Sequence, residues 1–344
     1  MNITTIGIDL AKNVLQVHGV DERGKASLRK QLKRAQVLNF FVNLPACLIG
    51  MEACGGAHFW ARKLTEMGHM VKLMAPQFVK PYVKTNKNDA ADAEAICEAV
   101  ARPNMRFVPV KNVEQQAVLG LHRARQGFVV ARTAQANQIR GLLAEFGFAI
   151  PQGIGLLVER LPDILADAEN DLSCASRELF SRLFEHFREL DRHVHELQAQ
   201  IHAWHREDER SRRLQAIPGI GPLSVSALVA SVGDAGTFKN GRQFAAWLGL
   251  VPRQNSSGGK ERLLGISKRG DVYLRTLLIH GARAVLRHLH RHTDQAEGWL
   301  ARLAARRNPN IAAVALANKN ARIVWALLTH GTEYRGTATF ARTA

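Results

Sequence analysis

Cysteine is scarce in this sequence, which has four in a chain of 344 residues. None of the four belongs to a CxxC pair or stands at metal-ligand spacing from a histidine, so neither a zinc motif nor a disulfide framework is indicated. We interpret them as small apolar residues in a reduced compartment. They are Cys47, Cys54, Cys97 and Cys174.

Long hydrophobic stretches are also missing. The sequence contains no run of about 18 uncharged apolar residues, so no membrane span and no membrane partner are predicted. Its first residues, MNITTIGIDLAKN, have neither a cationic beginning nor a long apolar core, so no secretory signal is predicted. The simplest expectation is a cytoplasmic protein.

Acidic residues are few compared with basic ones. Lys and Arg number 47 against 30 Asp and Glu, which gives a formal net charge of +17. The excess is greatest between residues 251 and 307, where 12 Lys and Arg face four Asp and Glu. Such a balance specifies no fold, but it favours a polyanionic partner, and nucleic acid is the first candidate.

The length of the chain and its changes of pattern predict three domains, since 344 residues exceed one ordinary core. We place them at 1–110, 111–205 and 206–335, an α/β domain followed by two mainly helical ones. In the middle domain, Val113–Phe146 and Leu172–His205 have helical spacing of apolar residues. They predict either a coiled coil that holds protomers together or an ordinary helical packing segment.

The first domain begins with three β-rich stretches, and alternating strands and helices follow. Three antiparallel strands before β-α-β units are the order of a ribonuclease-H-like fold, in which the first and fourth strands lie side by side. The predicted strands are Thr4–Asp9, Asn13–Asp21, Ala26–Leu32, Cys47–Cys54, Met70–Pro76 and Arg106–Val110.

Four carboxylates in this domain form a candidate metal site. Asp9 ends the first strand and Glu52 ends the core of the fourth, so the fold brings them together and a cation would relieve their repulsion. In NKNDAADAEA, Asp89 and Asp92 are three residues apart and share one face of a helix. The alternative is that Asp89 caps the helix and Asp92 sits in its favourable first turn. Together the four would hold two Mg²⁺ ions for in-line phosphoryl transfer.

The stretch PRQNSSGGKERLLGISKRG, residues 252–270, combines serines and glycines with a cluster of cations. It is either a solvated hairpin or a loop in which a hydroxyl acts on a strongly negative group. We expect its cations to hold phosphates. They are Arg253, Lys260, Arg262, Lys268 and Arg269.

A second glycine-containing turn, PGIGP at residues 218–222, resembles the turn of a helix-hairpin-helix motif. There, Gly219 and Gly221 would let backbone N–H groups approach a phosphate. The alternative is an ordinary tight connection between two helices.

Taken together, five segments closely resemble the DEDD-type insertion-sequence transposases, which are related to the Piv DNA invertase. The resemblance extends from about Ile3 to Leu328 and rests on the combination of motifs, because each is weak alone. The segments follow Asp9 and are GMEACGGAHFWARKL, KNDAADAEAI, IPGIGPLSVSALVA, AAWLGLVPRQNSSGGKERLLGISKRGDVYLRTLLIHGARAVL and NPNIAAVALANKNARIVWALL.

This resemblance implies an N-terminal RuvC-like domain whose DEDD set is Asp9, Glu52, Asp89 and Asp92. It also implies a serine nucleophile in the C-terminal domain, which corresponds best to Ser257, with Ser256 as the alternative if the register shifts by one. Members of the family act as homo-oligomers on double-stranded donor and target DNA, with Mg²⁺ and a structured guide (bridge) RNA.

We therefore predict a transposase that cuts and rejoins DNA through a transient phosphoserine link. Two other functions stay open. One is a RuvC-like nuclease that hydrolyses DNA with metal-activated water and needs no serine. The other is a non-catalytic nucleic-acid-binding scaffold whose carboxylates only cap helices or pair within the core.

Overall fold

The computed structural model describes residues 3–84, 88–289 and 298–335, and the chain divides into two compact units. Unit 1 comprises Met1–Gln115 together with Val232–Asp234. Unit 2 comprises Gln116–Ser231 and Ala235–Ala344. The domain boundaries at 110 and 205 stay predictions.

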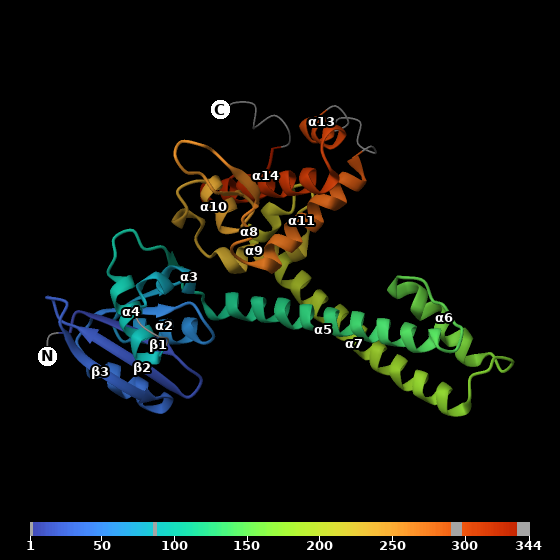
Figure 1. The fold of residues 1–344 in the computed structure, drawn as a ribbon, viewed down its shortest axis with the longest axis horizontal. Coiled ribbons are helices and arrows are strands. Elements are labelled where there is room, and N and C mark those ends of the chain that lie inside the picture. Colours follow the sequence, from blue (N-terminus) through green and yellow to red (C-terminus); the bar gives the residue numbers. More distant parts are fainter. Residues whose placement is uncertain (1–2, 85–87, 290–297, 336–344) are drawn as a thin grey trace. The chain divides into compact units, whose positions relative to one another are not determined.

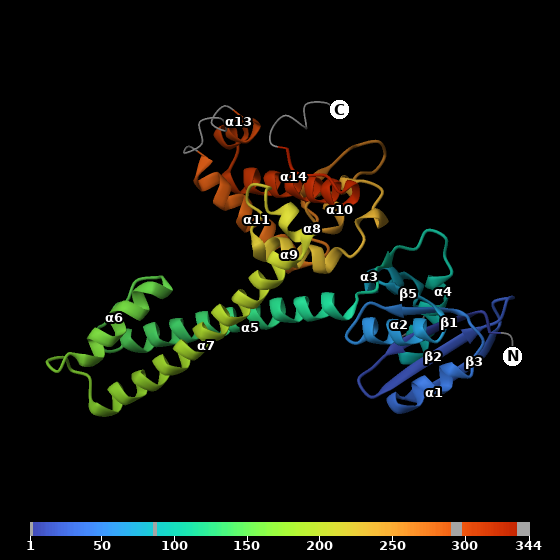
Figure 2. The same ribbon diagram turned by 180° about the vertical axis from the view of Figure 1, so that it is seen from behind.

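Unit 1 contains a six-stranded sheet in the order β3-β2-β1-β4-β5-β6 (Figures 1 and 2). The strands are Thr5–Leu10 (β1), Val14–Val20 (β2), Ala26–Lys33 (β3), Leu48–Glu52 (β4), Met70–Met74 (β5) and Phe107–Val108 (β6). β1, β2 and β3 are antiparallel, β1 is parallel to β4, β4 is parallel to β5, and β6 runs antiparallel to β5. The sheet is ribonuclease-H-like, and the predicted neighbouring of the first and fourth strands is confirmed.

Helices cover both faces of this sheet. They are α1 (Val37–Val42), α2 (Ala57–Glu66), α3 (Pro76–Val79) and α4 (Asp89–Val100), with short 3-10 turns at Arg34–Gln36 and Lys80–Tyr82. Side chains alternate along β1, so Ile6 and Ile8 point into the core formed with α1 and α2. Gly7 and Asp9 consequently lie on the other face, which α4 covers.

Glycine permits α4 to lie directly on the sheet. A Cβ atom added to Gly7 would stand 2.2 Å from the carbonyl oxygen of Ala93 and 2.3 Å from the backbone nitrogen of Cys97. A Cβ atom on Gly50 of β4 would stand 2.7 Å from Cβ of Val100. Real atoms do not approach so closely, so any side chain at these two positions would push the helix away.

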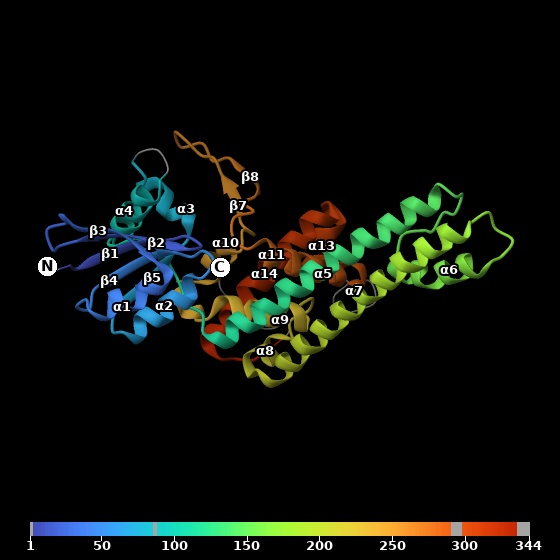
Figure 3. The ribbon, with the colours of Figure 1, turned by 90° about the horizontal axis from the view of Figure 1, so that it is seen from below.

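Two long antiparallel helices form an arm in unit 2 (Figure 3). They are α5 (Val113–Ala144), whose first residues belong to unit 1, and α7 (Cys174–Glu207), with α6 (Ile154–Ala166) packed against them. The Arg132 guanidinium of α5 pairs with the Asp191 carboxylate of α7, and Arg125 Nη2 donates to Gln198 Oε1 at 2.8 Å. The two long predicted helices are confirmed, whereas α6 was not predicted. A role of the arm in holding protomers together stays a prediction.

The remainder of unit 2 is mainly helical. Its elements are α8 (Glu209–Leu214), α9 (Pro222–Val232), a 3-10 turn (Ala235–Thr237), α10 (Gly241–Trp247), β7 (Pro252–Gln254), β8 (Leu263–Ile266), α11 (Val272–Arg287), α13 (Trp299–Arg306) and α14 (Pro309–His330). Among the described residues, α14 alone is long and apolar enough to cross a membrane by length and composition. Half of its apolar window is buried in the fold, and it packs on α10 and α11, so α14 is readily explained as a core helix.

A buried histidine joins the arm to the C-terminal helices. Ser226 Oγ of α9 donates its only proton to the Pro222 carbonyl at 2.7 Å. It must therefore accept a hydrogen bond from Nε2 of His122 of α5, at a distance of 3.0 Å. The other ring nitrogen, Nδ1, must then accept from the Tyr273 hydroxyl of α11 at 3.0 Å. Burial lowers the pKa of His122 to about 4, so this neutral form is the stable one.

This histidine predicts a loss of stability in acid. The unfolded chain binds a proton at His122 below its ordinary pKa of about 6.5, whereas the folded chain does so only below about 4. The free energy of unfolding should therefore fall by about 3 kcal/mol as the pH drops from 6.5 to 4. Urea unfolding of the wild type and of His122→Gln at several pH values measures this. His280→Gln, at an exposed position of α11, is the control, and an equal pH dependence in all three proteins would refute the prediction.

The contact of Gly7 with α4 predicts a second effect on stability. Gly7→Ala forces the helix backbone outward and should lower the free energy of unfolding of unit 1 by about 3 kcal/mol. Gly55→Ala is the matched control, because no atom lies within 4 Å of its added Cβ and the change should stay within about 0.5 kcal/mol. Urea unfolding of the wild type and of the two variants measures these changes in the free energy of unfolding.

Candidate functional site

Asp9 and Glu52 lie together at the ends of two adjacent strands. β1 and β4 are paired in parallel up to Ile8 and Met51, and the two acidic residues follow directly. Both residues are half-buried. Surrounding protein atoms raise the pKa of the Cys54 thiol, and the negative charges of Glu52 and Asp9 raise it further. Both carboxylates therefore lie near the Cys54 thiol, in agreement with their predicted positions at the ends of adjacent strands.

Asp89 belongs to the row of α4 that lies over β1. Residues four apart follow one another along a helix face, so Asp89, Ala93 and Cys97 form one row. The last two are the residues whose backbone meets Gly7. Since β1 and α4 run in opposite directions here, the row continues from Gly7 towards the end of β1 that carries Asp9.

Asp92 belongs to the neighbouring row, which lies over β4. This row continues through Ile96 to Val100, and Val100 is the side chain that meets Gly50. Glu52 is two residues beyond Gly50 and points to the same face of the sheet. The register thus places Asp9 and Glu52 on the α4 face of the sheet, and Asp89 and Asp92 in the first turn of the helix that covers this face.

The N-cap of α4 is Asn88, and its Oδ1 accepts a hydrogen bond from the Ala91 backbone nitrogen at 2.8 Å. The interpretation of Asp89 as the cap is therefore wrong, because Asp89 is the first residue of the helix proper. Both aspartates lie in the first turn, where the helix dipole favours negative charge.

The carboxylates fit a divalent ion by their chemistry. Mg²⁺ prefers oxygen ligands and commonly takes one or two protein carboxylates, with waters and substrate phosphates completing its shell. The pair Asp9 and Glu52 matches that requirement. Within residues 3–84, 88–289 and 298–335, however, no group of three or more His, Cys, Asp or Glu side chains is close enough to hold a metal ion. The site formed by four carboxylates stays a prediction.

The serine-containing stretch is a β-hairpin, formed by β7 and β8, that projects from unit 2 (Figure 3). Ser257 and Lys260 form a β-bridge, and the Lys260 backbone nitrogen donates to the Ser257 carbonyl at 3.0 Å. Between them, Gly258 and Gly259 have φ values of 55° and 75°. Two residues with positive φ make a type I′ turn, which glycine adopts without strain. Ser257 therefore stands immediately before the tip.

The hairpin register separates the two serines. Ser257 pairs with Lys260 and Gln254 with Leu263, which is the same register, and the register shifts only further down, between Pro252 and Gln254. Because side chains alternate, Ser257 shares its face with three cations, whereas Ser256 and the acidic Glu261 share the other. The cations on the Ser257 face are Arg253, Lys260 and Arg262, all of them exposed.

Hydrogen bonding also distinguishes the serines. The Ser256 Oγ accepts from the Arg262 backbone nitrogen at 3.1 Å, which gives this hydroxyl a structural role. Among the described residues the Ser257 hydroxyl has no hydrogen-bond partner. Ser257 is thus the hydroxyl that remains available on the cationic face.

The base of the hairpin is held by a buried arginine. Arg275 of α11 is 7% exposed, and its Nη1 donates to the Leu248 carbonyl at 3.2 Å and to the Arg269 carbonyl at 3.3 Å. In the sequence, Arg275 is only one of the 12 Lys and Arg of the basic excess between residues 251 and 307. No pattern in the sequence distinguishes it from the exposed Lys268 and Arg269, because its burial comes from the packing of α11.

The PGIGP turn connects α8 to α9, and its two glycines have different environments. Gly219 has φ of 82° and packs on Gly281 of α11, where an added Cβ would stand 2.7 Å from the Gly281 carbonyl oxygen. This close approach explains Gly219 without a nucleic acid. Gly221 is exposed and has no atom within 4 Å of an added Cβ. Phosphate binding by the turn stays a prediction, and Gly221 is the more accessible of the two.

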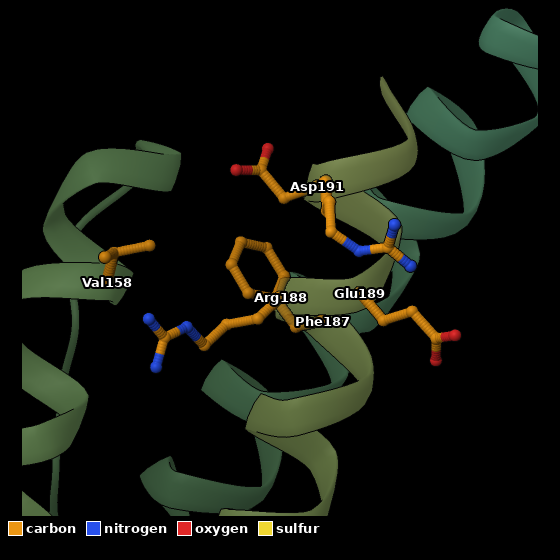
Figure 4. Close-up of a pocket in the computed structure, with 6 residues that line it drawn as sticks. Val158, Phe187, Arg188, Glu189 and Asp191 are labelled. Carbon is orange, nitrogen blue, oxygen red and sulfur yellow. The ribbon is translucent and has the colours of Figure 1, made fainter. Parts of the chain in front are cut away.

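A separate pocket of about 460 Å³ lies on the arm and contains none of the predicted site residues. In Figure 4, Val158 of α6 faces Phe187 and Arg188 of α7 across it. Its lining residues are Val158, Phe187, Arg188, Glu189, Asp191 and Arg192.

Comparison with known proteins gives matches along almost the whole chain. Residues 6–148 match a DEDD transposase model of the IS110 type, and residues 211–297 match the model described as "Transposase IS116/IS110/IS902 family". A "Probable family 20 transposase" of Pseudomonas aeruginosa is 57% identical over 336 residues, which cover 97% of this chain and 99% of that protein.

Two further relatives extend these similarities. The "Transposase for insertion sequence element IS1111A" of Coxiella burnetii is 48% identical over 97% of this chain and 92% of its own length. The "Pilin gene-inverting protein" of Moraxella bovis is 34% identical over 74 residues, which are 21% of this chain and 22% of that protein.

The buried arginine at the hairpin base predicts a local loosening. Arg275→Met removes the donor to the Leu248 and Arg269 carbonyls, a loss of about 1.5 kcal/mol, so amide exchange at Ser267 and Lys268 should be about tenfold faster. Hydrogen–deuterium exchange measures this. Arg283→Met, at an exposed position of the same helix, is the control and should leave both amides unchanged.

Proposed function

The chain belongs to the IS116/IS110/IS902 family of transposases and is an enzyme that acts on DNA, and we propose that it cuts and rejoins double-stranded DNA through Ser257. The DEDD domain implies the use of a divalent metal. One observation carries the choice of nucleophile: Ser257 is next to the hairpin tip, on the face with three exposed cations and without an intramolecular hydrogen-bond partner among the described residues.

In the proposed reaction, Ser257 Oγ attacks a DNA phosphorus atom. An O–P bond to serine forms, one bond between phosphorus and a sugar oxygen breaks, and the serine proton is passed on so that the leaving oxygen becomes a hydroxyl. A neutral serine is a weak nucleophile and requires activation. The phosphoserine link keeps the bond energy, so a second sugar hydroxyl can displace the serine and rejoin the strand.

The cationic face of the hairpin would position the phosphate. Arg253, Lys260 and Arg262 can donate to its non-bridging oxygens and stabilise the negative charge that develops during attack. The turn glycines beside Ser257 carry no side chain, so the DNA backbone can approach closely. Ser256, whose hydroxyl accepts from the backbone, keeps the hairpin in shape.

The carboxylates of unit 1 would hold the divalent ions. We assign this role to Asp9, Glu52, Asp89 and Asp92, and we expect two Mg²⁺ ions. Bound there, such ions supply charge stabilisation to the phosphoryl oxygens. We also expect the protein to act as a homo-oligomer, as the resemblance to the family implies.

We further propose a structured guide RNA as the element that selects the DNA sequence. Exposed basic residues of unit 2 outside the hairpin, among them Arg287, Arg306 and Arg307, can contact the backbone of this RNA. Exposed apolar side chains on the arm support association of protomers there. They are Val130, Leu142, Phe146, Val158 and Leu179.

If the protein is a hydrolytic nuclease, Ser257→Ala should cleave DNA as fast as the wild type does. The scaffold alternative predicts no cleavage at all and no effect of Asp9→Asn. The location of Asp9 and Glu52 at adjacent strand ends supports catalysis over a scaffold, because two neighbouring carboxylates are ligands that Mg²⁺ prefers.

The test is a search for a covalent protein–DNA adduct. We would incubate the protein and its co-purified RNA with Mg²⁺ and end-labelled DNA that spans the element junction, followed by a denaturing gel. Wild type should give a protein-linked band, and Ser257→Ala and Asp9→Asn should reduce it below detection because nucleophile or metal ligand is lost.

Ser256→Ala is the matched control, since it removes the neighbouring hydroxyl and should retain the adduct. Filter binding should show that Ser257→Ala still binds the same DNA. Loss of the band in Ser256→Ala alone would move the nucleophile by one residue. Cleaved ends without any adduct would favour the hydrolytic nuclease, and intact DNA in every lane would favour the scaffold.

A further inference from the structure

A second pocket lies beside the candidate carboxylates in unit 1, and no role for it follows from the proposed chemistry. It has a volume of about 240 Å³ and lies between the sheet and the first turns of α4. Its lining residues are Gln16, Val17, His18, Arg29, Asn88, Ala90, Ala91 and Glu94.

The strand register places this pocket next to Asp9. Gln16 of β2 is the direct cross-strand partner of Asp9, so their side chains share the α4 face of the sheet. Opposite residues of an antiparallel pair have Cβ atoms about 4.5–5.5 Å apart. A base bound in the pocket and a phosphate bound at Asp9 could therefore belong to the same nucleotide or to neighbouring nucleotides.

Two side chains that line the pocket carry hydrogen-bonding groups that make no hydrogen bond to the described residues. His18 is 6% exposed, and neither its ring nor the Gln16 amide has a hydrogen-bond partner among the described residues. Burial lowers the pKa of His18, with Glu94 opposing and Arg29 assisting the shift, so the imidazole is neutral at pH 7. A ligand with a matching donor and acceptor can therefore pair with both groups.

The charged side chains that line the pocket are one of each sign. The Arg29 guanidinium lies 3.9 Å from the Glu94 carboxylate, which Lys84 also approaches at 3.9 Å, so the lining residues do not favour a phosphate over a neutral ligand. What remains is a set of flat neutral groups, the Gln16 amide and the His18 imidazole, each with a donor and an acceptor. Ala90 and Ala91 add a small apolar wall. The volume is below the roughly 300–1,000 Å³ of drug-sized ligand sites, so only one small ring system fits.

Amides of Gln and Asn recognise base edges through paired donors and acceptors, and enzymes hold unpaired bases in small pockets of this kind. We propose that this pocket binds one unpaired base of the DNA substrate, adjacent to the phosphate that is cut. The proposal rests on the proposed function for its DNA substrate. It assigns Gln16 as the main base-contacting residue, with His18 as the second.

The experiment measures base binding independently of cleavage. We would titrate the full chain with a short single-stranded DNA that carries one 2-aminopurine, and follow the fluorescence. Gln16→Leu should weaken the binding of this base roughly tenfold, because one pair of hydrogen bonds is lost. Ala91→Leu, which fills the pocket from the helix, should have a similar effect.

Gln31→Leu is the matched control. Gln31 is the β3 partner of Gln16, is exposed, and does not line the pocket, so its variant should bind like the wild type. Equal affinity of Gln16→Leu and Gln31→Leu would overturn the proposal. The same oligonucleotide made of RNA tests the source of the base, and a clear preference for RNA would overturn the assignment to DNA.

The adduct assay separates this proposal from the proposed function. If the wild type forms the adduct but Gln16→Leu binds the base as tightly as the wild type does, the pocket proposal is wrong and the proposed function still holds. If Gln16→Leu binds the base more weakly than the wild type does but the wild type forms no adduct, the pocket proposal holds and the serine mechanism is contradicted.

Discussion

The arrangement of unit 1 depends on the close contact between the α4 backbone and two strand glycines. Gly7 and Gly50 have no side chains, so the helix lies directly on β1 and β4. This contact determines which rows of α4 lie over which strand, and hence where Asp89 and Asp92 stand relative to Asp9 and Glu52. It also leaves the first turns of α4 over β2, where the small polar pocket forms.

A comparable constraint operates in unit 2, where the backbone geometry of a hairpin organises charge. Two glycines in a type I′ turn define the register, and the register places Ser257 with three cations and Ser256 with the single acidic residue. The base is held by hydrogen bonds from the buried Arg275 rather than by an ion pair. Exposed cations on this strand pair suit a polyanion, since no acidic side chain among the described residues pairs with them.

Much of the fold was predictable because its signals are local. Alternation and apolar runs predicted the strands of the sheet, and helical spacing predicted α4, α5 and α7. The helix α6 was missed although it is longer than α4, because Pro162 inside it and the glycines at its start are typical of a break in a helix. Asp89 was assigned as a possible cap because Asn88 and Asp89 are both good capping residues, and only the observed hydrogen bond to Ala91 distinguishes them.

The sequence by itself determined the class of partner, the order of the elements and the candidate residues, because charge, periodicity and motif are properties of the chain alone. It could not decide between Ser256 and Ser257, since that depends on which face of the hairpin each occupies. Nor could it show that Arg275 and Gly219 are used in packing or that Gln16 and His18 line a pocket. These facts arise from contacts between segments distant in sequence, and only the tertiary structure brings those segments together.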